Sequence, residues 1–160
     1  MIDSKPSKSK SRKKINNRRK SRELAMKSIY RGLVNTFDLK QIQKDIRDDP
    51  DFIRADEKFY VEILKGVFKN LETLKLEIIS YIDRSYDELS PIELSIIYSS
   101  LYELKYSPSV PYKVVINEAI EVAKLFGGID GFKYINGILN QAAKKNRKEE
   151  FEKINKLQYF

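Results

Sequence analysis

Apolar residues recur at helical spacing along most of this chain. Between residues 56 and 82, a stripe that includes Phe59, Ile63 and Val67 continues through Leu74 and Ile78. Repeats of three or four positions predict amphipathic helices, whereas the strict apolar–polar alternation that predicts strands forms no clean run. The pattern therefore predicts an all-α fold, a single compact bundle of about seven helices.

The stretch 110–143, VPYKVVINEAIEVAKLFGGIDGFKYINGILNQAA, carries the strongest of these patterns. Residues 112–125 are apolar around most of the helical circumference, which predicts a helix in the centre of the fold. Gly127 and Gly128 are typical of a helix end. Asp130 is the predicted N-cap of the last helix, in which positions 135, 138, 139 and 142 point inward.

Capping residues mark where other helices begin. Ser90-Pro91-Ile92-Glu93 predicts a capping box, in which the Ser90 hydroxyl accepts from the Glu93 amide and the Glu93 carboxylate accepts from the Ser90 amide. Asp38 fits an N-cap. The predicted helices span about residues 18–35, 38–47, 91–106, 112–125 and 131 onward, with two consecutive helices between 56 and 82.

The positive charge is concentrated at the N-terminus. The 160 residues carry a net charge of +8, yet residues 1–22 alone contain ten Lys or Arg and one Asp, which leaves −1 for the other 138. Residues 1–17, rich in Ser and Lys, are predicted to be a disordered basic tail. Residues 18–145 form the predicted helical domain, and residues 146–160 a charged C-terminal extension. The acidic loop 48–51 is predicted to be solvated.

The residue types present exclude most enzymatic chemistry. The chain has no His and no Cys, which removes the commonest general base, disulfides and thiolate zinc sites. We therefore predict no catalytic residues, no metal site and no cofactor. Carboxylate pairs such as Glu118 and Glu121 fall on predicted surfaces. No apolar run is long enough to span a membrane, and no hydrophobic signal segment is present, so we predict a cytoplasmic protein without membrane contact.

Binding chemistry is better represented. The basic segment favours a polyanionic ligand, nucleic acid ahead of a membrane surface, with an inert solvated leader as the alternative. Single-stranded RNA additionally needs exposed aromatic and amide side chains that contact the bases. Candidates for such contacts are Tyr81, Lys133, Tyr134 and Asn136, and ordinary surface packing is the alternative for Tyr134.

Three segments carry a resemblance to a known family. VPYKVVINEAIEVAK, followed by FGGID and KYINGILNQAA, is similar to the most distinctive part of the NusB transcription-antitermination family. RRKSRELAMKSIY resembles the Arg-rich opening of that family, and SPIELSIIYSSLYEL resembles its middle helix. The similarity runs from about Arg18 to Lys145 and implies a single all-α domain of seven helices.

The resemblance implies an RNA-binding adaptor rather than an enzyme. Members of the family bind the boxA element of nascent ribosomal RNA leaders together with NusE, a small-subunit ribosomal protein, and the pair joins an RNA polymerase complex that resists termination. With Lys133 added from its residue type, the implied RNA-binding residues are Arg18, Arg19, Lys20, Arg22, Tyr81, Arg84, Lys113, Lys133, Tyr134 and Asn136. The implied NusE-facing positions are Tyr30, Glu93 and Asp130, or their near neighbours.

Some positions depart from the family pattern. Gly131 and Phe132 stand where the family often has Ser-His, and Tyr134 replaces Phe but keeps the ring. NusB-like domains also precede some ribosomal RNA cytosine methyltransferases, so the alternative interpretation is a helical protein-interaction module without sequence-specific RNA binding. The sequence leaves both a monomer and a homodimer open for the free protein.

Overall fold

The computed structural model describes residues 8–35, 38–126 and 130–157, with side chains from Asn17 onward in the first helix and up to Lys156 in the last. Within these ranges there are eight α-helices, two short 3₁₀ helices and no strand, which confirms the all-α prediction and adds one helix to it. Among the described residues, no helix is long and apolar enough to cross a membrane. The elements are α1 Lys8–Val34, α2 Leu39–Ile46, η1 Phe52–Arg54, α3 Glu57–Lys69, α4 Leu71–Tyr81, η2 Tyr86–Glu88, α5 Pro91–Tyr106, α6 Tyr112–Phe126, α7 Gly131–Asn146 and α8 Lys148–Leu157.

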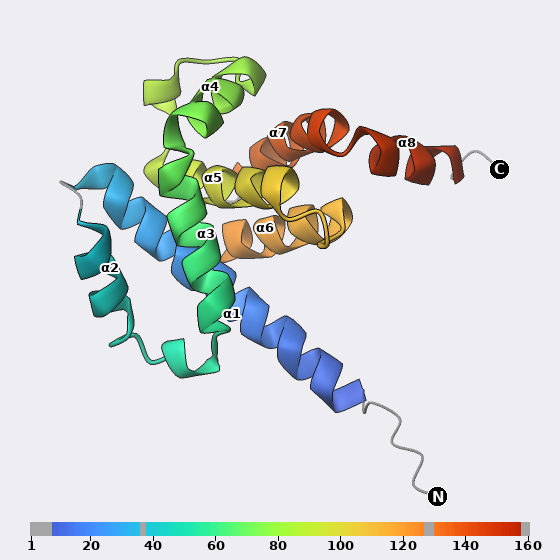
Figure 1. Ribbon diagram of the computed structural model, residues 1–160. Coiled ribbons are helices and arrows are strands. Elements are labelled where there is room, and N and C mark those ends of the chain that lie inside the picture. The colour runs from blue at the N-terminus through green and yellow to red at the C-terminus, as the bar shows by residue number, and fades with distance from the viewer. Residues whose placement is uncertain (1–7, 36–37, 127–129, 158–160) are drawn as a thin grey trace, which may run out of the picture.

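Helix α5 lies at the centre of the bundle (Figure 1). Every residue from Leu94 to Leu104 is buried, so the helix is enclosed on all sides by α1, α3, α4, α6 and α7. The apolar arc of residues 91–106 predicts this deep burial, but the sequence pattern also placed α6 in the centre. That prediction is wrong, because α6 keeps an exposed face that includes Val114, Asn117 and Glu121. Full enclosure is what a helix without a broad polar face requires.

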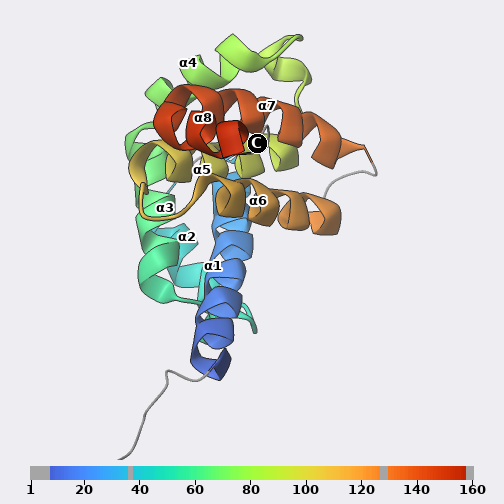
Figure 2. The ribbon, with the colours of Figure 1, turned by 90° about the vertical axis from the view of Figure 1, so that its right-hand side faces the viewer.

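Helix α1 begins at Lys8 rather than at the predicted Arg18, so residues 8–17, predicted to be disordered, are helical. Its first turns project from the bundle, and its later turns pack across α3, α5 and α6 (Figures 1 and 2). Leu24, Ala25 and Ile29 are buried on that packed side. The basic residues at positions 18, 19, 20 and 22, which we call the basic segment of α1, therefore lie where the projecting part of the helix meets the bundle.

The predicted helix starts are mostly confirmed. The Asp38 carboxylate accepts from the Lys40 amide at 3.0 Å, and the Ser90 hydroxyl accepts from the Ile92 and Glu93 amides at 3.2 and 3.4 Å. The return bond of the capping box is replaced by another contact. The Glu93 carboxylate lies against α7, where its Oε1 is 3.0 Å from the position that a Cβ on Gly131 would occupy.

The start of α7 differs from the expected cap. Asp130 occupies the N-cap position, but its side chain makes no capping hydrogen bond and instead pairs with Lys133 at 3.5 Å. Gly127 and Gly128, predicted to end α6, lie outside the described residues.

Helices α3 and α5 approach closely at Gly66. A Cβ at this position would lie 2.1 Å from Cε2 of the Tyr102 ring, and Tyr102 is itself buried. Gly66→Ala is therefore expected to lower the free energy of unfolding by about 1–2 kcal/mol, because displacing a packed ring outweighs the gain in helix propensity of about 1 kcal/mol.

Urea denaturation measures this effect, and Gly137→Ala is the matched control. Nothing lies within 4 Å of a Cβ added at Gly137, which is an exposed helical position. The control is expected to gain up to about 1 kcal/mol. Equal effects of the two substitutions would contradict the close approach of α3 and α5.

Residues 147–151, at the start of the segment 146–160 that was predicted to be a charged extension, pack against the bundle. Arg147 is buried and donates to the backbone carbonyls that end α5 and form the next loop. Its neighbour Glu150 accepts from Arg147 at 2.8 Å and from the Tyr112 amide at 2.9 Å. The ring of Phe151 in α8 also packs on Tyr112, with ring centroids 5.4 Å apart. This arginine and glutamate thus join three helix ends.

Candidate nucleic-acid interface

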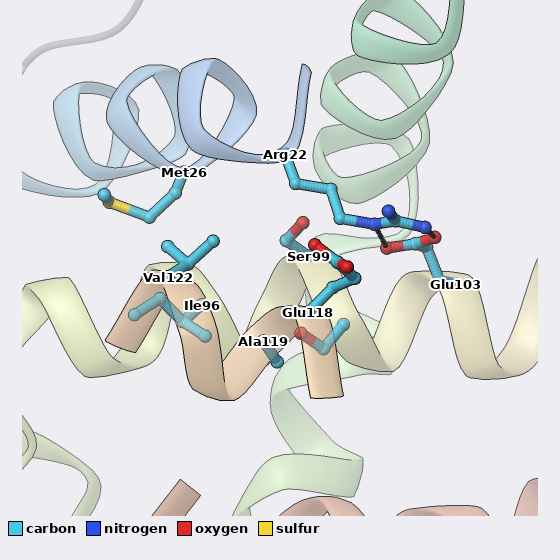
Figure 3. A pocket seen from close by; sticks show the side chains of 9 residues that line it. Arg22, Met26, Ile96, Ser99, Glu103, Glu118, Ala119 and Val122 are labelled. Carbon is cyan, nitrogen blue, oxygen red and sulfur yellow. Dashed lines mark hydrogen bonds and ion pairs between the residues drawn. The ribbon is translucent and has the colours of Figure 1, made fainter. Parts of the chain in front are cut away.

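Two of the arginines proposed to bind RNA hold α1 to the body of the protein. Arg19 forms a fork with Glu118 of α6, with both N–O distances at 2.9 Å. Arg22 forms a fork with Glu103 of α5 at 2.8 and 2.9 Å, and the side chains of this pair are only 7% and 2% exposed (Figure 3). Charge-assisted forks of this kind fix orientation strongly. The primary contacts of both arginines in this structure are therefore intramolecular.

The carboxylate partners also correct two predictions. Glu118, predicted to lie on the surface, is buried, and its hydrogen bond and charge raise the pKa of Arg19 above its usual range. The acidic loop 48–51, predicted to be merely solvated, docks on α1. Its Asp49 pairs with Lys27 at 3.1 Å, and its Asp51 lies 3.5 Å from Lys20. Most of the charge on the body of α1 is thus balanced within the protein.

Lys20 and Arg18 complete the basic segment. Lys20 also donates to Glu23 at 3.2 Å, and this hydrogen bond raises the pKa of Lys20. Arg18 differs from the other three, because its guanidinium lies over the Phe59 ring, 4.6 Å from the centroid, and no carboxylate pairs with it among the described residues. Arg18 is therefore the residue of this segment whose charge is available to an external anion.

A small cavity separates α1, α5 and α6 beside the Arg22–Glu103 pair (Figure 3). Its volume is about 10 Å³, which is room for one water molecule. The cavity is therefore too small for a nucleobase. It is lined by Arg22, Met26, Ile96, Ser99, Ser100, Glu103, Glu118, Ala119 and Val122.

A second cluster joins the end of α4 to the first half of α7. Arg84 follows α4 and lies over the Tyr134 ring, 4.2 Å from the centroid. Asp83 accepts from Arg84 Nε at 3.1 Å, and from the Tyr134 hydroxyl at 3.5 Å through the same Oδ1 oxygen. These three residues, which we name the Arg84 stack, bring together two of the residues predicted from sequence and add one, Asp83, that was not predicted.

Tyr81 is held one turn before this stack. Its hydroxyl donates to Glu77 at 3.1 Å, and burial, followed by the charge of Glu77, raises the pKa of Tyr81. Glu77 also accepts from Lys105 at 2.9 Å and from Asn146 at 2.8 Å. Although burial opposes ionisation, these bonds lower the pKa of Glu77. A buried carboxylate thus orients one of the predicted RNA-binding aromatics.

The remaining predicted residues lie on helix surfaces. Lys133 is exposed and pairs with Asp130 on the first turn of α7. Asn136 accepts from the Asn140 side chain through its carbonyl and its amide oxygen at 2.8 and 3.1 Å. Lys113 is exposed on the first turn of α6. The structure therefore brings Arg84 and Tyr134 together, with Tyr81 close in sequence at the end of α4. Lys133 and Asn136 lie on another face of α7, because helical residues one or two positions apart do not face the same way. Lys113 and the basic segment of α1 lie on other helices.

The three positions expected to face a protein partner fall toward one end of the bundle. Arg22 meets Glu103, and Met26 lines the same cavity as Ile96, so α1 and α5 run antiparallel. Tyr30, further along α1 and 38% exposed, therefore lies toward the start of α5, where Glu93 stands. The Glu93 carboxylate lies against Gly131, the residue after Asp130, so Asp130 lies near this end as well.

The fold is that of a NusB-like helical bundle. A solved structure of NusB from T. maritima matches with a TM-score of 0.73 at 31% sequence identity, covering 84% of this chain and 96% of that one. The sequence model of the NusB family matches residues 19–144. The protein therefore belongs to the NusB family.

Relatives in several bacteria support the same assignment. A protein of Methylobacillus flagellatus, named transcription antitermination protein NusB, is 46% identical over 136 residues, which is 85% of this chain and 88% of the relative. Proteins of the same name from Neisseria meningitidis and Thiobacillus denitrificans are each 42% identical and are covered over 94% and 96% of their lengths.

Proposed function

We propose that this protein is a non-enzymatic, RNA-binding transcription antitermination factor. The observation that carries the proposal is family membership over nearly the full length of relatives that are named transcription antitermination proteins. Following the family, its RNA ligand would be the boxA element of a ribosomal RNA leader, and its protein partner would be NusE. Together they would join an RNA polymerase complex and oppose termination.

The arrangement of side chains supports RNA as the ligand. Recognition of single-stranded RNA relies on stacking planes, amide groups and cations that contact phosphates. The edge between α4 and α7 offers Arg84 and Tyr134 as planar groups, and Asn136 offers an amide on another face of α7. Arg18 and Lys113 are cations without a carboxylate partner among the described side chains, so we assign them to phosphates. Arg19 and Arg22 are proposed to act indirectly, by holding α1 in place.

The partner surface follows from the same reasoning. Tyr30, Glu93 and Asp130 combine a partly exposed ring with two carboxylates toward one end of the bundle. This composition suits a basic protein segment, because opposite charges steer association and fix the docking orientation. We propose that NusE binds at this end and leaves the edge between α4 and α7 to RNA.

A titration tests ligand and partner together. Fluorescently labelled boxA RNA and a scrambled RNA of equal length are titrated with the protein, each with and without NusE. NusE is expected to tighten binding of boxA RNA but not of the scrambled RNA. Binding of both RNAs should weaken as salt rises, because phosphate contacts release counterions. Equal affinities for the two RNAs with and without NusE would contradict sequence-specific binding and favour a helical protein-interaction module.

A further inference from the structure

The Arg84 stack places its arginine between the tyrosine and the solvent. Tyr134 is partly buried and packs against the hydrophobic core, while the Arg84 guanidinium lies over the ring at 4.2 Å from its centroid. The Arg84 side chain is 46% exposed. An incoming base therefore meets the guanidinium before it meets this face of the ring.

Asp83 fixes that guanidinium and balances its charge. One carboxylate oxygen accepts from Arg84 Nε at 3.1 Å and from the Tyr134 hydroxyl at 3.5 Å. The carboxylate lowers the attraction of Arg84 for a phosphate, because the pair has no net charge. The planar face of the guanidinium is unaffected by this pairing and can still stack on a base.

We propose that one base of the bound RNA stacks on the outer face of the Arg84 guanidinium, giving the layers base, Arg84 and Tyr134. In this arrangement Arg84 contacts the RNA, whereas Tyr134 and Asp83 are positioning residues that act through it. The inference rests on the proposed RNA-binding function and replaces direct stacking of a base on Tyr134. In this proposal Arg84 contacts the face of a nucleobase rather than a phosphate.

Three substitutions separate the possible roles of these residues. Arg84→Lys keeps the charge but removes the plane, so it is expected to weaken binding of boxA RNA with NusE by about 5- to 150-fold, the range for the loss of one stacked base. The dependence of affinity on salt should stay as in the unmodified protein, because no phosphate contact is lost. Tyr134→Phe keeps the supporting ring and should change affinity less than about 3-fold, whereas Tyr134→Ala should approach the loss seen with Arg84→Lys.

Arg47→Lys is the matched control. Arg47 is also an exposed arginine paired with a carboxylate, at 2.9 Å from Glu57, and lies at the end of α2 outside the Arg84 stack. Its substitution is expected to leave RNA affinity unchanged. Circular dichroism and the urea midpoint of each variant show whether the fold is retained. Retention is expected for Arg84→Lys, because Arg84 is exposed.

Abasic substitutions in the RNA locate the stacked base. Each nucleotide of boxA is replaced in turn by an abasic one, and the affinity of each RNA is measured with the unmodified protein and with Arg84→Lys. One position should weaken binding to the unmodified protein and have no further effect on the variant. Arg84→Lys with unmodified affinity, or Arg84→Ala that binds as tightly or more tightly, would overturn the stacking on Arg84 while leaving the proposed function intact. Failure of the unmodified protein to bind RNA would overturn both.

Discussion

Glu103→Ala is expected to lower the free energy of unfolding by about 3–5 kcal/mol, the cost of leaving a buried charge without its partner. Arg22 and Glu103 form a two-bond fork between α1 and α5 with almost no exposure to water. When the carboxylate is removed, the Arg22 guanidinium keeps its position under α1 and loses both acceptors. Urea denaturation, extrapolated to water, measures the difference.

The double variant Arg22→Met, Glu103→Leu supplies the matched comparison. Replacing both members of a buried pair with apolar residues of similar size is often neutral or stabilising, so this variant should recover most of the lost stability. Glu121→Ala, at an exposed carboxylate on α6, should stay within about 0.5 kcal/mol of the unmodified protein. A cost below about 1 kcal/mol for Glu103→Ala would contradict a buried, mutually dependent pair.

The same double variant decides the role of Arg22 in RNA binding. If Arg22 acts only by holding α1, the refolded double variant binds boxA RNA with the affinity of the unmodified protein. A marked loss of affinity in a stable double variant would return Arg22 to the RNA-binding residues that the family resemblance implies.

Arg147→Ala is expected to destabilise the protein by about 2–6 kcal/mol. The buried carbonyls of Leu104 and Val110 lose their donor at about 1–3 kcal/mol each, whereas the other two carbonyls that Arg147 contacts keep a backbone amide donor. The guanidinium donates to the carbonyl oxygens of four residues, at distances of 2.7–3.1 Å. These carbonyls end α5 or belong to the loop that leads into α6, and they belong to Glu103, Leu104, Ser107 and Val110. Urea denaturation gives the magnitude.

Two further variants control this experiment. Lys148→Ala, next in the chain and exposed, should leave stability within about 0.5 kcal/mol. Arg147→Lys retains the charge but cannot reproduce the five planar donors of the guanidinium, so it should restore only part of the stability. If Arg147→Lys had the full stability of the unmodified protein, the positive charge rather than the set of hydrogen bonds would hold the α5–α6 loop.

Local features of the fold could be read from the sequence because they depend on neighbouring residues. The caps at Asp38 and Ser90 are formed by a side chain and amides two or three positions away. The division of residues 56–82 into two consecutive helices likewise follows from local pattern, and the structure places the break between α3 and α4 at Asn70. Helical periodicity then identifies which face of each helix is buried.

Pairs of distant residues could not be predicted in this way. Arg22 meets Glu103 across 81 positions, and Arg19 meets Glu118 across 99. One signal was present for Arg22, since it continues the row of Met26 and Ile29 on the buried side of α1. For Asp83, adjacency to Arg84 was visible, but contact with Tyr134 depends on how α7 packs beside α4.

The length of these connections also bears on how the protein folds as it is synthesised. At about 5–20 residues per second, roughly 5–20 s separate the synthesis of Arg19 from that of Glu118. For most of that interval the basic helix has neither of its long-range carboxylates, since Glu103 is synthesised only shortly before Glu118. The hydrogen bonds from Arg147 to the α5–α6 loop form later still. The bundle is helical, yet its assembly depends on contacts between residues far apart in the chain, so we expect slower folding than in bundles whose contacts are local.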